Sequence, residues 1–317
     1  MALPTLSTTS VAGDERFVDP AQCQACGGTL QVRFATVRDP RTLETFSILE
    51  CSRCGLGHTS PRPSHLEKYY RDYHGGRHGK TADYCARRRV RILQQVTGNT
   101  TGRLLDIGCG DGTFLLAARA AGWSVVGTEM NATFPRQAGL EVYPKISDVR
   151  SHAPFDSITL WHTLEHLPDP RATLKEIHGL LSSNGALIIA VPNAGGLQAR
   201  AFGAKWFHLD VPRHLYHFTR SSLASLLQSE GFAPFREWHQ EFEYDLLGWS
   251  QSALNLTPLP ANLFFDLLRG FKPPVGPLAS VATSVSGSLL TALSIFFVPL
   301  GTLTRRGGTL IVASRPA

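Results

Sequence analysis

Several familiar signals are missing from this sequence, and each absence narrows the choice of protein class. The first residues contain no charged segment followed by an apolar core, so a secretory signal peptide is not predicted. Charged residues make up only 18% of the 317 residues, and the net charge of +6 is weak evidence for an anionic partner. The 43% of hydrophobic residues suits a globular protein of one full domain plus attachments. Because a secretory signal peptide is not predicted, we expect a cytoplasmic protein.

Cysteine is scarce, and its spacing is informative. Four of the six cysteines form two C-x-x-C-G pairs, Cys23 with Cys26 and Cys51 with Cys54. Strand-like stretches over residues 31–37 and 45–49 lie between the pairs. Four thiolates complete a closed tetrahedral site for structural Zn²⁺, whereas a redox dithiol needs one pair beside a βαβ unit. The pattern predicts a zinc ribbon over residues 21–60, after a flexible arm over residues 1–20.

The glycine pattern of dinucleotide sites, G-x-G-x-x-G, is absent from the predicted strand–turn–helix segment over residues 104–115. Its glycines, Gly108, Gly110 and Gly112, follow the pattern G-x-G-x-G. Glycine lets the backbone approach a ligand closely, and the helix predicted over residues 113–121 offers free N–H groups to that ligand. The segment therefore predicts a nucleotide or nucleoside site and disfavours a nicotinamide oxidoreductase.

Strands alternate with helices after this turn. Strands are expected over residues 124–128, 155–161 and 186–191, and a helix is expected after Pro170. The alternation predicts an α/β fold with a doubly wound parallel sheet, in which ligands bind beyond the carboxyl ends of the strands. Glu129 follows the strand over residues 124–128, where a carboxylate can accept both hydroxyls of a ribose.

These motifs resemble the class I S-adenosylmethionine (SAM) dependent methyltransferases. Asp106 before the glycines resembles motif I of that family, in which the acid lies near the amino-acid end of SAM. The segments L-E-H-L-P-D-P (164–170) and V-P-N (191–193) are similar to the branch that includes ubiquinone-biosynthesis O-methyltransferases. The resemblance implies a Rossmann-like methyltransferase core over residues 101–235, with SAM as cofactor. The predicted cofactor-binding residues are Asp106, Gly108, Cys109, Gly110, Gly112, Glu129, Met130 and His162.

The segment His162-x-x-Glu165-His166 needs separate treatment, because it matches the H-x-x-E-H motif of some zinc proteases. That motif requires a helix, and here it follows a strand and precedes Pro168, so a protease is not predicted. In the ubiquinone O-methyltransferases the same loop carries E-x-x-E-H and binds a divalent ion, and here His162 replaces the first glutamate. Metal binding and simple hydrogen bonding within the pocket both stay open.

The loop over residues 205–219 is dense in aromatic and titratable side chains, which is typical of a substrate wall. Histidine is the natural base near neutral pH. We predict His214, His217 and His166 as candidate catalytic bases; the alternative for each is helix capping or core packing.

Residues 61–100 are predicted to form a helical linker. Tyrosines between residues 69 and 73 either cover the cofactor pocket or pack in the core. A helix is expected over residues 82–96, and its arginine run at residues 87–91 is expected to be a solvated face.

The last part, residues 236–317, is predicted to contain a sixth strand near residues 235–242, an apolar insert and a final strand over residues 309–313. Residues 273–304 carry no charge and are long enough to cross a bilayer. Prolines and glycines interrupt them, and the final strand must return to the same sheet. We expect peripheral contact with the inner face of a membrane through residues 260–306, with Arg305 and Arg306 near headgroups; the alternative is a lid or a dimer surface.

These observations predict a SAM-dependent methyltransferase that acts on a hydroxyl or activated carbon of a small-molecule, saccharide or lipid-linked acceptor. One alternative is an RNA methyltransferase with a zinc ribbon, and another is a non-catalytic SAM-binding scaffold. Nucleic acid is not an expected partner, because the strand expected over residues 155–161 leads into the segment W-H-T-L-E-H (161–166). Amine methyltransferases of nucleic acids carry a proline-proline-aromatic clamp at this point.

Overall fold

The computed structural model describes residues 17–18, 21–63, 65–70, 81–271 and 275–317. Residues 1–16 and 19–20 of the predicted arm over residues 1–20, and the tyrosine-bearing segment over residues 71–73, lie outside the described residues.

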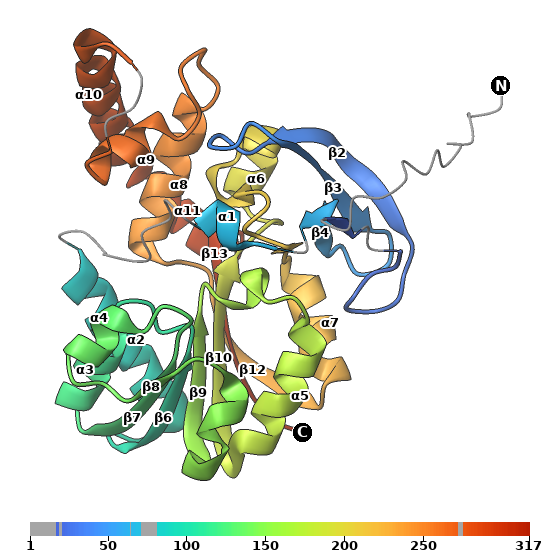
Figure 1. The fold of residues 1–317 in the computed structure, drawn as a ribbon, viewed down its shortest axis with the longest axis vertical. Coiled ribbons are helices and arrows are strands. Elements are labelled where there is room, and N and C mark those ends of the chain that lie inside the picture. Colours follow the sequence, from blue (N-terminus) through green and yellow to red (C-terminus); the bar gives the residue numbers. More distant parts are fainter. Residues whose placement is uncertain (1–16, 19–20, 64, 71–80, 272–274) are drawn as a thin grey trace.

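A twisted central sheet with helices on both faces forms the body of the molecule (Figure 1). The strand order is β12-β13-β10-β9-β6-β7-β8. The strands are β6 (Gly102–Ile107), β7 (Trp123–Thr128), β8 (Val142–Tyr143), β9 (Phe155–Trp161), β10 (Leu181–Pro192), β12 (Phe232–Trp238) and β13 (Thr309–Pro316). The α/β class and the Rossmann-like sheet are confirmed.

The sheet is mixed. Strands β6 to β10 pair in parallel, whereas β13 runs antiparallel to both β10 and β12. The reason is that the insert before β13 lies at the carboxyl edge of the sheet. Thr309 therefore starts β13 opposite Pro192, at the end of β10, and the strand has to run back.

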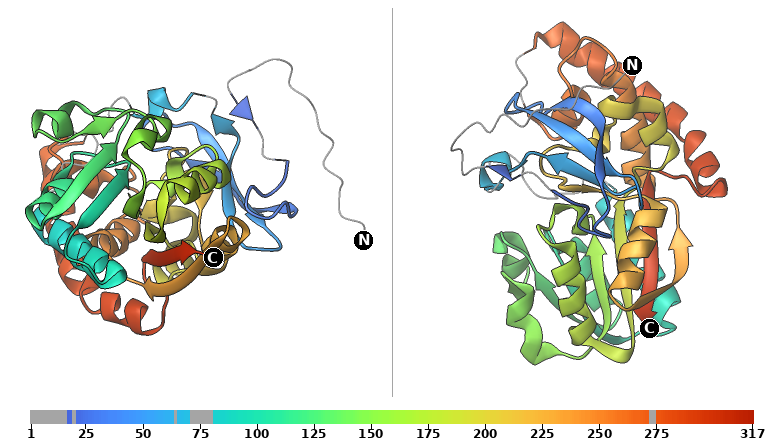
Figure 2. Two further views of the ribbon diagram at one scale, coloured as in Figure 1. Left: turned by 90° about the horizontal axis from the view of Figure 1, so that it is seen from below. Right: turned by 90° about the vertical axis from the view of Figure 1, so that its right-hand side faces the viewer.

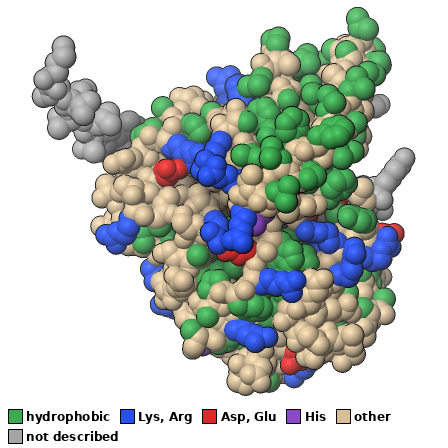
Figure 3. Space-filling view, turned by 180° about the vertical axis from the view of Figure 1, so that it is seen from behind, with side chains coloured by type: hydrophobic (Ala, Val, Ile, Leu, Met, Phe, Trp, Pro, Cys, Tyr) green, Lys and Arg blue, Asp and Glu red, His purple; other side chains and the backbone are tan. Residues whose placement is uncertain are grey.

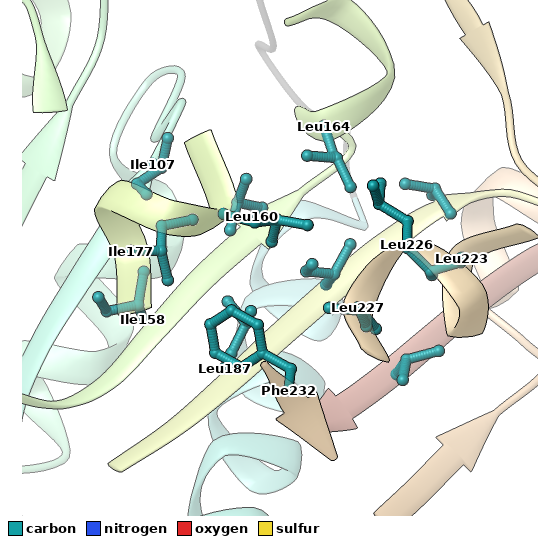
Figure 4. Packing of buried hydrophobic residues seen from close by; sticks show 14 of the residues in the cluster. Ile107, Ile158, Leu160, Leu164, Ile177, Leu187, Leu223, Leu226, Leu227 and Phe232 are labelled. Atoms are coloured by element: carbon teal, nitrogen blue, oxygen red, sulfur yellow. The ribbon is translucent and has the colours of Figure 1, made fainter. Parts of the chain in front are cut away.

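Two apolar cores lie on the two faces of the sheet, as the period-two pattern of the strands dictates. Leu105 and Ile107 face a core shared with α5 and α7, whereas Leu104 faces a core shared with α2 and α3. Figure 4 shows the first of these cores, in which Ile107, Leu160, Leu227 and Phe232 belong to one packed cluster. The helices and turns of the core are α2 (Ala82–Thr97), α3 (Thr113–Ala120), α4 (Thr133–Gln137), η1 (Ile146–His152), α5 (Pro170–Leu180) and α7 (Arg220–Ser229).

The cysteine-bearing ribbon lies against the carboxyl edge of this sheet (Figure 2). Its antiparallel sheet has the order β11-β4-β3-β2, and β11 comes from the loop after β10 rather than from the ribbon's own sequence. Its elements are β2 (Leu30–Arg38), β3 (Thr45–Cys51), β4 (Gly57–Ser60) and β11 (Tyr216–His217). The short pair β1 (Phe17–Val18) and β5 (Arg62–Pro63) and the helix α1 (Glu67–Tyr70) adjoin it.

The insert between β12 and β13 is helical. Its helices are α8 (Phe242–Leu254), α9 (Leu263–Leu268), α10 (Pro277–Ser294) and α11 (Phe297–Leu303). The sixth strand was predicted too far along the chain, because Phe242 already starts α8. By length and composition, residues 277–303 could cross a membrane, and only 22% of the apolar window is buried in the fold.

Candidate active site

The glycine turn joins β6 to α3 at the carboxyl edge. Gly108, Gly110 and Gly112 all have positive φ, at 72°, 57° and 81°. A Cβ atom on Gly108 would lie 2.6 Å from Thr163, and one on Gly112 would lie 2.5 Å from Leu140. A Cβ atom on Gly110 would meet nothing within 4 Å. The outer glycines are thus required by packing, whereas Gly110 borders the open space that a nucleoside needs.

Two carboxylates flank this turn. The backbone N–H of Gly110 donates to Glu129 Oε2 at 3.0 Å, and that of Asn131 donates to Oε1 at 3.1 Å. Asp106 is buried and accepts a hydrogen bond from Thr159 Oγ1 at 2.6 Å. Burial raises the pKa of Asp106 to about 7, against the opposing effects of Thr159 and Arg89. A cationic ligand beside Asp106 would favour its ionised form.

The remaining predicted cofactor residues have different settings. The Cys109 side chain packs under β7, because a Cβ atom on Gly127 would lie 2.8 Å from its Sγ, so only its backbone belongs to the turn. Met130 follows Glu129 and is 83% exposed. His162 points away from the turn into a buried ionic network.

This network centres on Glu241, which precedes α8 of the insert. His162 Nε2 lies 2.6 Å from Glu241 Oε2, and Arg89 Nε donates to Oε1 at 2.8 Å. The His162 ring, held at a positive φ of 53°, stacks on Tyr244 with 4.0 Å between ring centres. Burial alone would lower the pKa of His162, but the Glu165 and Glu241 carboxylates raise it to about 9. His162 is therefore a cation between two carboxylates.

Arg89 corrects the prediction that residues 87–91 form a solvated face. Arg87 and Arg91 are exposed, but Arg89 is buried over the Trp161 ring, 4.8 Å from its centre. A guanidinium in this position requires an anion, and Glu241, distant in sequence, forms an ion pair with it at 2.8 Å. The sequence offered no local signal for this pair.

Glu165, His166 and His214 form a second cluster. Glu165 and His166 belong to η2 (Leu164–His166), directly after β9, and His214 comes from the loop after β10. One ligand atom from each residue lies within 4.8 Å of those of the other two. The two imidazole rings meet edge to face, with 4.6 Å between their centres. Thr163, which packs against Gly108, places this cluster next to the glycine turn.

The hydrogen bonds of the two rings assign their protons. His166 Nδ1 lies 2.9 Å from the Arg213 carbonyl, and His214 Nδ1 lies 2.8 Å from the His208 carbonyl. A carbonyl only accepts, so each Nδ1 donates, and in the neutral ring Nε2 keeps a lone pair. Both Glu165 oxygens are buried without a hydrogen-bond partner among the described residues. The cluster therefore brings together acceptors that need a donor or a cation.

Charge inside the cluster is unevenly shared. Burial lowers the pKa of His214 to about 4, and the neighbouring His166 adds to this effect. Burial would raise the pKa of Glu165, but His162 and the two histidines of the cluster hold it below its usual value. The structure thus favours a neutral His214 facing an ionised Glu165.

Arg213 connects the cluster to the ribbon. Its buried guanidinium donates to Asp210 Oδ1 at 2.6 Å and to Asp39 Oδ1 of the ribbon at 3.3 Å. The Leu215 N–H donates to the Glu165 carbonyl at 2.8 Å. The Tyr70 hydroxyl, from the predicted tyrosine segment, lies 3.0 Å from His166 Nδ1. The ribbon and the residues just after it therefore help to position the two histidines.

His217 does not join this cluster. It lies in β11, almost fully buried, and its Nε2 is 3.0 Å from Thr59 Oγ1 of the ribbon. Gly57 leaves it just enough room, because a Cβ atom there would lie 2.9 Å from that of His217. This setting favours a packing role over the predicted catalytic one.

The four paired cysteines meet at one point. The Cys23 and Cys54 sulfurs are 3.6 Å apart, and those of Cys26 and Cys51 are 3.5 Å apart. A tetrahedral zinc with Zn–S bonds of about 2.3 Å would space its sulfurs by about 3.8 Å. The donor set and its spacing therefore fit the predicted structural ion.

Comparison with known proteins agrees with this geometry. The model of a methyltransferase domain family matches residues 77–236, half of the chain. The chain is 28% identical over 165 residues to the ubiquinone biosynthesis O-methyltransferase of Bordetella avium, covering 46% of this chain and 68% of that protein. It is 31% identical over 118 residues to that of Histophilus somni, covering 32% and 50%.

The chain thus spans between 50% and 68% of the length of these relatives. Among solved structures, a SAM-dependent methyltransferase from Archaeoglobus fulgidus is 16% identical, with a TM-score of 0.46, covering 79% of this chain and 99% of that one. The family match and the glycine turn lead to one conclusion: the chain belongs to the class I SAM-dependent methyltransferases.

Proposed function

We propose that this methyltransferase acts on a hydroxyl oxygen of a small-molecule acceptor and that His214 takes the proton. The observation that carries the proposal is the cluster of unsatisfied acceptors beside the glycine turn. Among the described residues neither Glu165 oxygen has a hydrogen bond, and Oε1 has only the ion pair with His162 at 3.6 Å. The His214 Nε2 lone pair and Glu165 Oε2 can therefore accept a hydrogen bond, which an acceptor hydroxyl can donate. The relatives are named as O-methyltransferases, which agrees with transfer to oxygen.

The chemistry divides between cofactor and protein. When bound, SAM supplies an electrophilic methyl group on a sulfonium. Because that donor is already reactive, the chain's main tasks are alignment and removal of the hydroxyl proton. His214 Nε2 receives the proton, and the resulting imidazolium is stabilised by Glu165 and by Asp210, whose Oδ2 lies 4.0 Å away.

The test compares two neighbouring histidines. His214→Gln should lower the rate of S-adenosylhomocysteine formation by about 10²–10⁴-fold while SAM binding by calorimetry is unchanged. His217→Gln is the matched control, which should lower thermal stability but leave the rate within a few-fold. Suitable acceptors are a catechol, an alkyl-substituted catechol and a polyprenyl-phosphate sugar. Unchanged turnover in the His214 variant would refute its role as base.

The same cluster favours a second candidate, a divalent ion held by Glu165, His166 and His214. Each imidazole already donates its Nδ1 proton to a carbonyl, the usual arrangement behind a metal-binding Nε2. His162 would not take part, because Glu241 holds its Nε2. Metal analysis of protein purified with and without chelator, followed by activity with added Mg²⁺ or Zn²⁺, separates the two candidates. Full activity of metal-free protein would exclude the ion.

We also propose Zn²⁺ at the four ribbon cysteines and an acceptor with a lipid or lipid-linked saccharide portion, used at the cytoplasmic face of a membrane. The sulfur spacing supports the ion. The exposed apolar residues of the insert support the lipid portion. A lipid acceptor predicts a lower KM for the alkyl-substituted catechol than for catechol itself, with little change in kcat. Equal KM values would refute it.

A further inference from the structure

Helices α10 and α11 expose most of their large apolar side chains, whereas a surface helix of a globular protein normally buries them. The inward face of α10 against α8 and α9 consists of small or polar residues, since Thr283, Gly287 and Ser294 are buried. Helix α11 buries only Val298 and Gly301. The outward face of the two helices is apolar, and its exposed residues are Leu278, Val281, Val285, Leu289, Leu293, Phe296, Leu300 and Leu303. Figure 3 shows this face as a continuous hydrophobic surface over the two helices. In water such a surface is costly, so it indicates a partner.

A groove lined by four arginines begins where α11 ends. Arg305 and Arg306 follow that helix, and Arg200 from α6 (Leu197–Phe202) and Arg220 from α7 complete the set around a volume of about 650 Å³. Arg220 is paired with Glu237 at 2.7 Å. Within the described residues, the other three arginines form no ion pair. The groove therefore carries uncompensated positive charge.

Charge is one-sided along this whole region. Between residues 246 and 306 the chain has a single acid, Asp266, and four basic residues, Arg269, Lys272, Arg305 and Arg306. That acid is neutralised by Arg41 at 2.9 Å. Positive side chains next to an uncharged apolar face match the layering of a bilayer surface, with phosphates outside and acyl chains inside. Figure 3 shows Lys and Arg side chains gathered beside the hydrophobic helices.

We propose that the arginine groove binds the phosphate of an anionic phospholipid while α10 and α11 lie in the bilayer surface. A second copy of the chain fits less well, because the apolar helices would then face each other with four arginines of each copy close by. Crossing the bilayer is excluded for one helix, since β13 returns to the same sheet as β12. The inference rests on the proposed lipid acceptor, and it adds a site for lipid phosphate outside the active site.

The test measures partition of the full chain onto sedimented vesicles of phosphatidylcholine with and without phosphatidylglycerol. We expect binding that depends on phosphatidylglycerol. Arg305→Gln/Arg306→Gln should weaken it by about fivefold per arginine, or about 30-fold for both. Leu289→Ser/Leu293→Ser should weaken binding by about tenfold or more for each leucine.

Arg119→Gln/Arg315→Gln is the matched control, because both arginines are exposed near the opposite edge of the sheet. It should bind vesicles like the parent chain. All variants should keep SAM binding and the transfer rate on soluble catechol. A failure of membrane binding is thereby distinguished from a failure of the proposed methyl transfer.

Three outcomes would overturn the inference. Equal binding to both vesicle types, unchanged by substitution of Arg305 and Arg306, would show that the arginine groove does not recognise an anionic phospholipid. Absence of vesicle binding with a concentration-dependent dimer, abolished by the leucine substitutions, would assign the apolar face to a second copy. Tight calorimetric binding of glycerol 3-phosphate without vesicle binding would assign the groove to a soluble ester.

Discussion

The ribbon and the insert both join the carboxyl edge of the same sheet, but they differ in how much apolar surface they leave exposed. The ribbon turns polar groups inward: Asp39 and Thr59 are fully buried and hydrogen-bonded to Arg213 and to the His214 carbonyl. Helix α10 also buries small polar residues, yet α10 and α11 leave most of their leucines in solvent. Just before α8, the insert places the buried Glu241 in the ionic network of the core.

The difference separates two ways of adding to an enzyme. Buried hydrogen bonds from the ribbon hold the loop that carries His214, so the ribbon helps to position the candidate site. An exposed apolar face holds nothing within the chain, so it is adapted to something outside it. The direction in which an attachment turns its apolar side chains thus indicates whether it acts on the site or on a partner.

Removal of zinc should give the largest effect. It should disrupt the ribbon and the loop that the ribbon holds, and it should leave the insert unaffected. Structural zinc contributes about 10–16 kcal/mol to small zinc domains. Cys51→Ser should therefore abolish zinc binding and methyl transfer, while vesicle binding through the insert persists. Zinc content, near-ultraviolet circular dichroism and vesicle sedimentation measure this, with Cys85→Ser as the control. Retained turnover in zinc-free protein would break the link between the ribbon and the site.

Glu241→Ala should give the next largest effect, because it removes the buried carboxylate through which the insert is ion-paired with the core. The variant leaves two buried cations, Arg89 and His162, without their carboxylate. Loss of one partner of a buried pair costs about 3–5 kcal/mol. Glu237→Ala, which removes the more exposed pair with Arg220, should cost about 0–1 kcal/mol. Urea unfolding compares the two, and equal losses would contradict the network.

On α10, adding a methyl group to a glycine should cost more stability than truncating a leucine. Gly287→Ala forces a methyl group into the Phe264 ring and should destabilise by about 1–3 kcal/mol. Leu289→Ala, on the exposed face, should stay within about 0.5 kcal/mol. Thermal unfolding in vesicle-free buffer makes the measurement. A larger loss for Leu289 would show that its side chain is packed inside an assembly of copies.

The pH dependence of SAM binding should give the smallest effect and provides a reference within the core. Because the pKa of Asp106 is raised to about 7, the free enzyme holds a proton there below that pH. A cation prefers the carboxylate, so the proton must leave, and affinity should fall about tenfold per pH unit below 7 and level off above it. Calorimetry in two buffers of different ionisation enthalpy detects the released proton. Asp106→Asn should abolish the slope, and a slope that survives it would exclude Asp106.

Much of the fold could be predicted because its signals are local. The strand over residues 155–161 was predicted with its actual bounds, and the helix after Pro170 begins there because Asp169 caps it through the Ala172 N–H. The insert was harder, since α10 and α11 carry no charged residue to mark the exposed side of each helix. Arg89 was misjudged because a run of arginines shows no local sign of which one turns inward.

The candidate site divides in the same way. The glycine turn, Glu129 and the two cysteine pairs are each specified by neighbours in sequence, because turn geometry and ligand spacing are short-range properties. The sequence alone therefore determined the glycine turn and the two cysteine pairs. Only the tertiary structure decided that His214 meets Glu165 while His217 does not, and that Glu241 meets Arg89 across 152 positions. Those contacts depend on how separate elements pack and on which buried charges must be neutralised, and no local pattern encodes either.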